Sequence, residues 1–560
     1  MVVNKMDWQK NLLIAAILAV LLMLVIRWHN FQEQHALQTP AVASSTSTSA
    51  VNNTASDANA TEIPSATPSP SSIPTSSNTG LALAEIISVK TDSLDISINP
   101  LGGDIVKVAL PKHFDQLDTP DVPFVLLDNR DGHTYIAQSG LIGANGTDSA
   151  GSRPFFASAQ TQYELRPGED KLVVDLSLQQ GEVTITKRFS FSRGEYKVDV
   201  EYLVDNKSSS NWSAQLYGQI KRDSQVFSKS SALQMNPFLG AAITTNEHNY
   251  KKLTFSDLAE KNVEFTKQGG WVAMVQHYFI SAWIPNADTE NSYHLRKLGD
   301  KDLYLLGFTS KTLQVAAGES GSVKASFYAG PKDTESLEKI SPYLDLTVDY
   351  GWLWWVAMPL FALLKLIHGV VGNWGFAIIG LTIIVKAVFF KLSATSYKSM
   401  AKMRKLAPKM ADMKERFGDD RQKMSQEMMK LYKTEKVNPF GGCLPLLIQM
   451  PVFLALYWVL MESVELRHAP FILWINDLSV LDPYFVLPVI YGISMFFMQK
   501  LNPQPTDPMQ AKVMQMLPLV FTFMFLWFPA GLVLYWVTNN TLSIAQQYVI
   551  TKQIENDDKA

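Results

Sequence analysis

The chain has 560 residues, enough for two or three domains, and a net charge of −3. This small total hides an asymmetry, because residues 31–350 carry 26 basic and 37 acidic side chains, whereas residues 391–438 carry 13 basic and 6 acidic ones. Positive loops of membrane proteins stay in the cytoplasm, so the contrast places residues 391–438 inside and the acidic region outside. The one cysteine, Cys443, excludes a disulfide framework, so the acidic region depends on its own core.

The N-terminal region contains a continuous apolar run at residues 12–26, behind two lysines, which is typical of a signal peptide or of a membrane anchor. The nearest Ala-x-Ala pattern starts at Ala41, about fifteen residues past the run, which is too far for ordinary cleavage. We therefore predict an uncleaved transmembrane anchor in residues 1–30. Residues 31–80 are rich in Ser, Thr, Ala and Pro and predict a disordered linker, because this composition buries too little apolar surface to fold.

Residues 81–331 change to a period of two, as in the alternating stretch 197–202, with frequent turn signals. This pattern predicts a large exported antiparallel β-sandwich. No phosphate loop, paired metal-ligand spacing or nucleophile elbow occurs, so neither a cofactor nor a metal is expected. Four side chains could line a ligand cleft, although the core is the more usual place for them: Trp212, Trp271, His277 and Trp283.

A helical pattern resumes after the β-rich region. Residues 332–370 predict an amphipathic, Trp-rich helix at the membrane interface. Residues 371–550 predict a membrane core, and 551–560 form a short tail. Together with the anchor, five later segments give six transmembrane spans with both termini in the cytoplasm: 371–391, 440–461, 484–499, 513–528 and 532–550.

The basic segment 393–438 predicts two amphipathic helices joined by a turn at 418–420, packed as a helical hairpin. Its methionine stripes form a promiscuous binding surface or bury each other, and the second interpretation is favoured. Its basic outer face could dock RNA or anionic lipid, or could be a solvated face that follows the charge rule.

Lys386 is the only charged residue between 372 and 390, and a lone cation costs roughly 2.5–3.5 kcal/mol at mid-helix. Thr382, one turn earlier, shares its helical face. Lys386 lies close enough to the helix end to snorkel, so a snorkelling lysine and a buried, working cation both remain open. Other spans carry Gln449, Tyr535 and Asn539, and intramembrane polar groups normally face a bundle interior or a wet cavity.

Six motifs occur in a specific order: GNWGFAI at 372–378, SMAKMRKLAPK at 399–409, SQEMMKLYKTEKVNPFGGCLPLLIQMP at 425–451, WIND at 474–477, TDPMQ at 506–510 and LWFPAGLVLYW at 526–536. With them the chain resembles the YidC-type membrane protein insertases, in the Gram-negative form with a large periplasmic domain. The resemblance covers essentially the whole chain and is densest from 372 to 547. It implies a bacterial inner-membrane insertase and chaperone, not an enzyme, that passes nascent hydrophobic segments through a hydrophilic groove into the bilayer.

The resemblance also implies site residues and partners. Lys386 stands where relatives have an arginine, which keeps the charge but loses the planar five-donor fork. The groove would be lined by Lys386, Thr382, Gln449, Tyr535 and Trp536. A hydrophobic slide would comprise Met450, Phe453, Met524 and Phe528. Tyr397 and Asp507 would meet the ribosome, although the tail here is short and not basic. Expected partners are nascent membrane proteins, the Sec translocon, the ribosome and membrane lipids, with no small-molecule substrate.

Two other classes compete with this interpretation. A small-solute transporter or channel would also place polar groups in broken helices, and liposome flux would reveal it. A receptor that senses a ligand with residues 81–331 would show ligand-dependent melting of that region.

Overall fold

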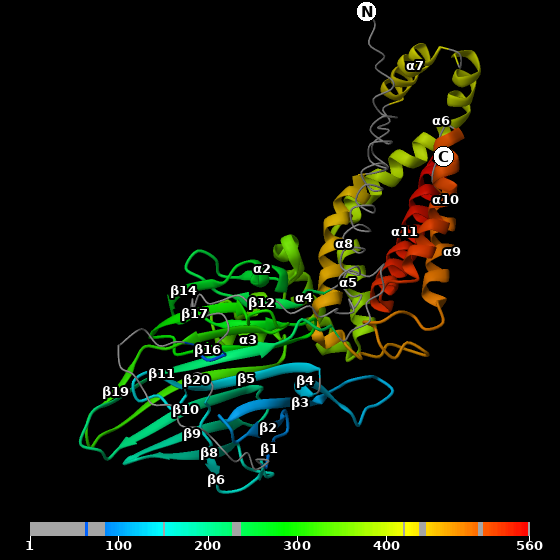
Figure 1. Cartoon of the computed structure of the whole chain (residues 1–560). Coiled ribbons are helices and arrows are strands. Elements are labelled where there is room, and N and C mark those ends of the chain that lie inside the picture. Colours follow the sequence, from blue (N-terminus) through cyan, green and yellow to red (C-terminus); the bar gives the residue numbers. More distant parts are fainter. Residues whose placement is uncertain are drawn as a thin grey trace, which may run out of the picture. The chain divides into compact units, whose positions relative to one another are not determined.

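The computed structural model describes residues 62–64, 85–130, 132–148, 152–226, 237–417, 420–435, 444–501 and 508–557 (Figure 1). The predicted anchor, the linker apart from residues 62–64, and Asp507 lie outside the described residues.

Two sheets make up the β-rich region, and only the pairing of β1 with β7 is parallel among the described strands. The 11-stranded sheet has the order β14 (Val263–Gln268), β17 (Glu290–Lys297), β18 (Tyr304–Thr309), β11 (Trp212–Arg222), β5 (His133–Ile142), β4 (Pro123–Arg130), β3 (Asp104–Phe114), β2 (Asp95–Asn99), β1 (Ile87–Lys90) and β7 (Gln162–Glu164), with β19 (Leu313–Val315) paired to β11. The nine-stranded sheet has the order β13 (Lys251–Leu253), β12 (Gly240–Ile243), β15 (Val272–Val275), β16 (Phe279–Pro285), β20 (Ser320–Pro331), β10 (Lys197–Asn206), β9 (Val183–Ser192), β8 (Lys171–Gln180) and β6 (Ala157–Ser158).

The sandwich core lies between the inner faces of these sheets. In β10 every second side chain is buried, as a strand with one face on the core requires. Tyr202 of β10 and Leu216 of β11 belong to one apolar cluster, so the predicted antiparallel β-sandwich agrees with the structure. Trp212, Trp271 and Trp283 are buried, so they belong to the core and do not line a cleft.

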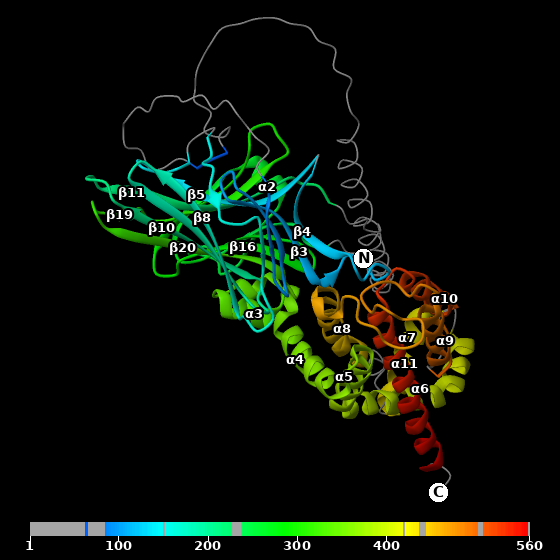
Figure 2. The same cartoon turned by 90° about the horizontal axis from the view of Figure 1, so that it is seen from below.

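The remaining described residues are mainly helical, and α9 lies beside both α10 and α11 (Figure 2). The helices are α2 (Phe255–Glu260), α3 (Thr334–Ile340), η2 (Leu344–Thr347), η3 (Gly351–Leu353), α4 (Trp354–Val371), α5 (Trp374–Val388), α6 (Phe390–Phe417), α7 (Arg421–Thr434), α8 (Leu444–Glu462), η5 (Val464–Leu466), α9 (Val486–Leu501), α10 (Pro508–Phe525) and α11 (Ala530–Asp557).

By length and apolar composition, one described helix, Gly351–Val371, could cross a membrane. The pair α5 and α6 makes a second candidate if the two count as one span, although a bend of 69° separates them. Helices α8, α9 and α10 contain shorter apolar segments. The count of six spans and the interfacial position of residues 332–370 therefore remain predictions.

Local chemistry explains the break between α4 and α5. Gly372 adopts φ 68° at the end of α4, a left-handed conformation that glycine tolerates best. The Asn373 side chain then accepts a hydrogen bond from the backbone N–H of Phe376 and caps α5. The two helices consequently start and stop within three residues of each other.

The predicted helical hairpin is present as α6 and α7. Leu406 and Met410 of α6 are buried against Met428 and Tyr432 of α7, so the two stripes bury each other. This confirms the favoured interpretation of the methionine pattern. Helix α6 begins at Phe390, earlier than the methionine pattern indicates, because no helix breaker separates it from that pattern.

Helix α11 is longer than the predicted span 532–550. It continues to Asp557 and takes in most of the predicted tail. No glycine or proline follows Gly531 in this segment, so nothing in the sequence ends the helix there.

The β-sandwich and the helical region meet through polar contacts near the end of α8. The Lys332 ammonium lies 2.7 Å from the Glu462 carboxylate, and their side chains are 2% and 9% exposed. A ring nitrogen of His277 lies 2.7 Å from the carbonyl oxygen of Met461. Arg467 donates hydrogen bonds of 2.7 and 3.1 Å to two backbone carbonyl oxygens at the end of β3. His277 is therefore a contact residue of this junction.

Candidate functional site

One face of α11 carries buried polar side chains within an otherwise apolar helical region. Asn539, Ser543 and Gln547 are spaced by four residues, which places them in line along the helix, and Asn540 lies beside them. Asn540 donates a hydrogen bond to the Ser494 hydroxyl on α9 at 3.1 Å. These side chains define the α11 polar face.

Lys386 on α5 points at this face. Its ammonium donates a hydrogen bond to Ser543 Oγ at 2.6 Å, and Ser543 Oγ donates to the carbonyl oxygen of Asn539 at 2.7 Å. Lys386 is 9% exposed. The structure therefore favours the buried cation over the snorkelling one.

No carboxylate in the described part of the chain pairs with Lys386. An ammonium that is removed from water without a counter-charge is costly, and it attracts an anion that can reach it. The site consequently combines burial, a positive charge and, among the described residues, one neutral hydrogen-bond partner, Ser543.

Gln449 extends the polar face into α8. Its side-chain amide donates to Asn539 Oδ1 at 2.6 Å, and it lies beside the buried hydroxyl of Tyr535. The Trp536 indole N–H is buried without a hydrogen-bond partner among the described residues. A buried donor of this kind costs about 1–3 kcal/mol, so a polar guest that accepts its hydrogen bond would be stabilised.

Thr382 does not take part in these contacts. Its hydroxyl donates to the carbonyl oxygen of Ile378 in the preceding turn of α5, at 2.7 Å. Thr382 is buried, and its hydroxyl is occupied by a hydrogen bond within its own helix.

A cavity of about 250 Å³ lies along the C-terminal part of α11. Gln547 and Thr551 of α11 line it together with two basic side chains of α6, Arg404 and Lys405. Because Ser543, Gln547 and Thr551 follow one another by single turns, the polar face leads from Lys386 to this cavity. The sequence carries this signal as a spacing of four in residues 539–551; the prediction includes Asn539 and, one turn before it, Tyr535, but not Ser543, Gln547 or Thr551.

The four predicted slide residues have different surroundings. Met450 and Met524 are exposed. Phe453 packs on Trp536 with ring centroids 4.8 Å apart, and Phe528 is likewise partly buried among aromatic rings.

Neither of the two predicted ribosome-contact residues is found at the described surface. Tyr397 is 8% exposed and packs with Met400 and with Ile550 of α11. Its side chain therefore lies between α6 and α11 and is not displayed at the surface. Asp507 lies outside the described residues.

Large apolar side chains cover the outer sides of α9 and α10. A surface of this kind is unusual on a protein surrounded by water and is normal for one surrounded by lipid. The exposed residues are Val489, Ile490, Ile493, Phe496, Phe497, Val513, Met516, Leu519, Val520 and Phe523.

Comparisons with known proteins match most of the chain to one family. A family model described as the YidC periplasmic domain matches residues 86–363, and one described as the 60Kd inner membrane protein matches residues 366–558. The membrane protein insertase YidC of Cellvibrio japonicus is 69% identical, covering 99% of this chain and 100% of that protein. The corresponding protein of Saccharophagus degradans is 55% identical, covering 98% and 100%. A crystal structure described as an active YidC insertase with its first transmembrane domain resolved aligns with a TM-score of 0.38 at 18% identity, covering 84% of this chain and 93% of that one.

Proposed function

Because this chain belongs to the YidC family of membrane protein insertases, we propose that its α11 polar face is the path of a client's polar tail. The chain is a bacterial inner-membrane insertase, not an enzyme, and its clients are nascent membrane proteins. The transporter and receptor alternatives are therefore set aside. The observation that carries the proposed path is the buried Lys386, which faces this surface and has no counter-charge in the described residues.

The free energy of partitioning explains why a polar path is sufficient for insertion without nucleotide hydrolysis. A client helix of about 20 apolar residues gains roughly 0.3–0.6 kcal/mol per residue on entering the bilayer, so ~6–12 kcal/mol in all. The barrier is the polar tail, which costs ~2.5–3.5 kcal/mol for each charge that crosses the hydrocarbon. A polar face partway through the core shortens the apolar distance that the tail must cross.

Lys386 acts on acidic tails in this scheme. A carboxylate reaches the basic cavity beside Arg404 and Lys405, then meets the ammonium of Lys386. The tail leaves when the apolar segment partitions into lipid, because the ammonium regains its hydrogen bond to Ser543. Thr382, Gln449, Tyr535 and Trp536 would complete the groove. Met450, Phe453, Met524 and Phe528 would guide the apolar segment.

The test is reconstitution in liposomes with two ribosome-synthesised single-span clients that differ only in an acidic or a neutral tail. Protease protection reports insertion. We expect Lys386→Ala to lose insertion of the acidic-tail client while retaining the neutral one, and Lys386→Arg to insert both. Lys391→Ala, which removes an exposed lysine five residues away, is the matched control. Equal insertion of the acidic-tail client by Lys386→Ala and the unmodified chain would refute the role.

The finer topology belongs to the same proposal. Residues 81–331 lie in the periplasm, residues 393–438 and both termini lie in the cytoplasm, and residues 332–370 form an interfacial helix. The charge asymmetry between the acidic and basic regions supports this arrangement. Labelling of single cysteines from either side of right-side-out vesicles would test it.

Partner contacts follow from that topology. The ribosome would meet the basic hairpin and Asp507, with Tyr397 positioning α6 against α11 and making no direct contact. The periplasmic β-sandwich would contact the Sec translocon. Co-sedimentation with ribosomes would test the hairpin, and charge-reversal variants on its exposed face should weaken binding.

A further inference from the structure

Residues 62–64 of the predicted linker are docked on the β-sandwich. The Glu62 carboxylate accepts a hydrogen bond from the Gln138 side chain at 3.0 Å and lies 3.0 Å from the Lys221 ammonium. The backbone carbonyl oxygen of Glu62 accepts a hydrogen bond from the Gln219 side chain at 3.0 Å. Three side chains of β5 and β11 thus bind one linker residue.

The next linker residue fills an apolar position beside these contacts. Ile63 is 7% exposed and packs with Ile142 of β5 and Tyr217 of β11. Tyr217, Gln219 and Lys221 alternate along β11 with core residues, so they share the sheet face that points away from the sandwich core. The polar contacts of Glu62 and the apolar contacts of Ile63 are therefore adjacent on one surface.

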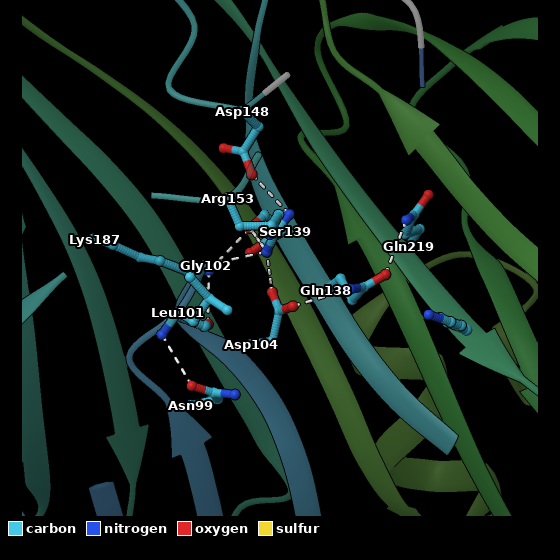
Figure 3. Close-up of polar contacts among 12 residues, drawn as sticks. Asn99, Leu101, Gly102, Asp104, Gln138, Ser139, Asp148, Arg153, Lys187 and Gln219 are labelled. Atoms are coloured by element: carbon cyan, nitrogen blue, oxygen red, sulfur yellow. Dashed lines mark hydrogen bonds and ion pairs between the residues drawn. The ribbon is translucent and has the colours of Figure 1, made fainter. Parts of the chain in front are cut away.

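Further hydrogen bonds fix the orientation of the two side-chain amides, Gln138 and Gln219, that bind Glu62. Gln138 Nε2 also donates to Asp104 Oδ2, and Gln219 Nε2 also donates to Gln138 Oε1, both at 3.0 Å (Figure 3). Asp104 is paired in turn with Arg153. Each amide nitrogen uses both of its hydrogens, so a hydrogen-bond acceptor is required at the position of the Glu62 carboxylate.

We propose that this face of β5 and β11 is a binding site for a short peptide in which a carboxylate side chain is followed by an aliphatic one. Its occupant is the segment 62–64 of the chain itself. Docking holds the linker on the domain at residue 62 instead of at β1. At ~3.5 Å per residue, the greatest length of chain between residue 30 and its attachment point falls from about 200 Å at Ile87 to about 110 Å at Glu62. The site therefore limits how far the β-sandwich can move from the predicted anchor.

The chain contains its own matched control for this specificity. A second Ile-Pro pair occurs at residues 73–74, preceded by Ser72 where Glu62 precedes the first pair. A serine there would leave Lys221 without its carboxylate partner. Exchanging the two preceding residues should therefore move the occupant ten positions along the linker.

Spin-label mobility in the full chain in nanodiscs tests the proposal. Cys443→Ser provides a cysteine-free background, and Thr61→Cys or Ser71→Cys takes a nitroxide. We expect the label at 61 to be at least fivefold slower than the label at 71. The exchange variant Glu62→Ser/Ser72→Glu should reverse this order.

Two further measurements test whether the slow motion of the label at 61 is caused by binding of Glu62 at this site. Glu62→Gln, which alters no residue of the sandwich, should release the label at 61, and so should Lys221→Met. Millimolar free peptide with the sequence of residues 61–65 should also release it, whereas the peptide with Gln for Glu should not. Labels at 61 and 71 that are equally mobile, or a slow label at 61 that neither Glu62→Gln nor the peptide releases, would overturn the proposal.

Discussion

The buried ion pair between Lys332 and Glu462 gives the sharpest test of the junction between the β-sandwich and the helices. With side chains 2% and 9% exposed and 2.7 Å between the charged atoms, each group has lost most of its contact with water. Lys332→Met removes one partner and leaves a buried carboxylate, which costs about 3–5 kcal/mol. Lys332→Met/Glu462→Met removes both charges, so we expect its free energy of unfolding to lie within about 1 kcal/mol of that of the unmodified chain.

Chemical denaturation in detergent, followed by tryptophan fluorescence, measures both variants. The exposed pair of Lys365 and Glu335, at 2.6 Å with side chains 33% and 67% exposed, provides the control. Lys365→Met should cost no more than about 1 kcal/mol, because exposed pairs contribute little. The reasoning fails if Lys332→Met is no more costly than Lys365→Met, or if the double variant is as unstable as Lys332→Met alone.

Three other predictions concern separate regions. Gly375→Ala should lower the free energy of unfolding by about 1–3 kcal/mol, because the added carbon would overlap the Phe471 ring, and thermal unfolding measures this. Arg467→Met removes the terminal guanidinium nitrogen that donates to both carbonyl oxygens and should cost about 1.5–3 kcal/mol, measured by the denaturation midpoint; an unchanged midpoint would contradict it. Burial raises the pKa of Glu62, but contacts with Lys221 and other donors outweigh burial and hold this pKa below its ordinary value. Docking should therefore be complete above the undocked pKa of about 4.3 and weaken as the pH falls through the lower docked value; nitroxide mobility should follow the pH, and Glu62→Gln should abolish the dependence.

Local patterns predicted much of the fold. The alternation in 197–202 became β10, and the methionine stripes became a hairpin whose helices bury each other, because both features depend on neighbours close in sequence. The break at Gly372 likewise follows from one residue. Elements of this kind are visible without a tertiary structure.

Long-range contacts could not be predicted in the same way. Lys386 was identified as a buried or snorkelling cation, but its partner Ser543 lies 157 residues away, and no local pattern connects them. Glu62 lies in a segment whose composition predicts disorder, yet three side chains from distant strands bind it. Tyr397 was expected at a surface, and the packing of α11 against α6 buries it.

The ion pair at the junction also sets an order of events during synthesis. Glu462 follows Lys332 by 130 residues, so at about 5–20 residues per second it emerges about 7–26 s later. The β-sandwich can complete its strands in that interval, but it has no partner for Lys332 until α8 has been made. This contact between the β-sandwich and α8 thus comes late, and it marks a chain whose translation has passed α8.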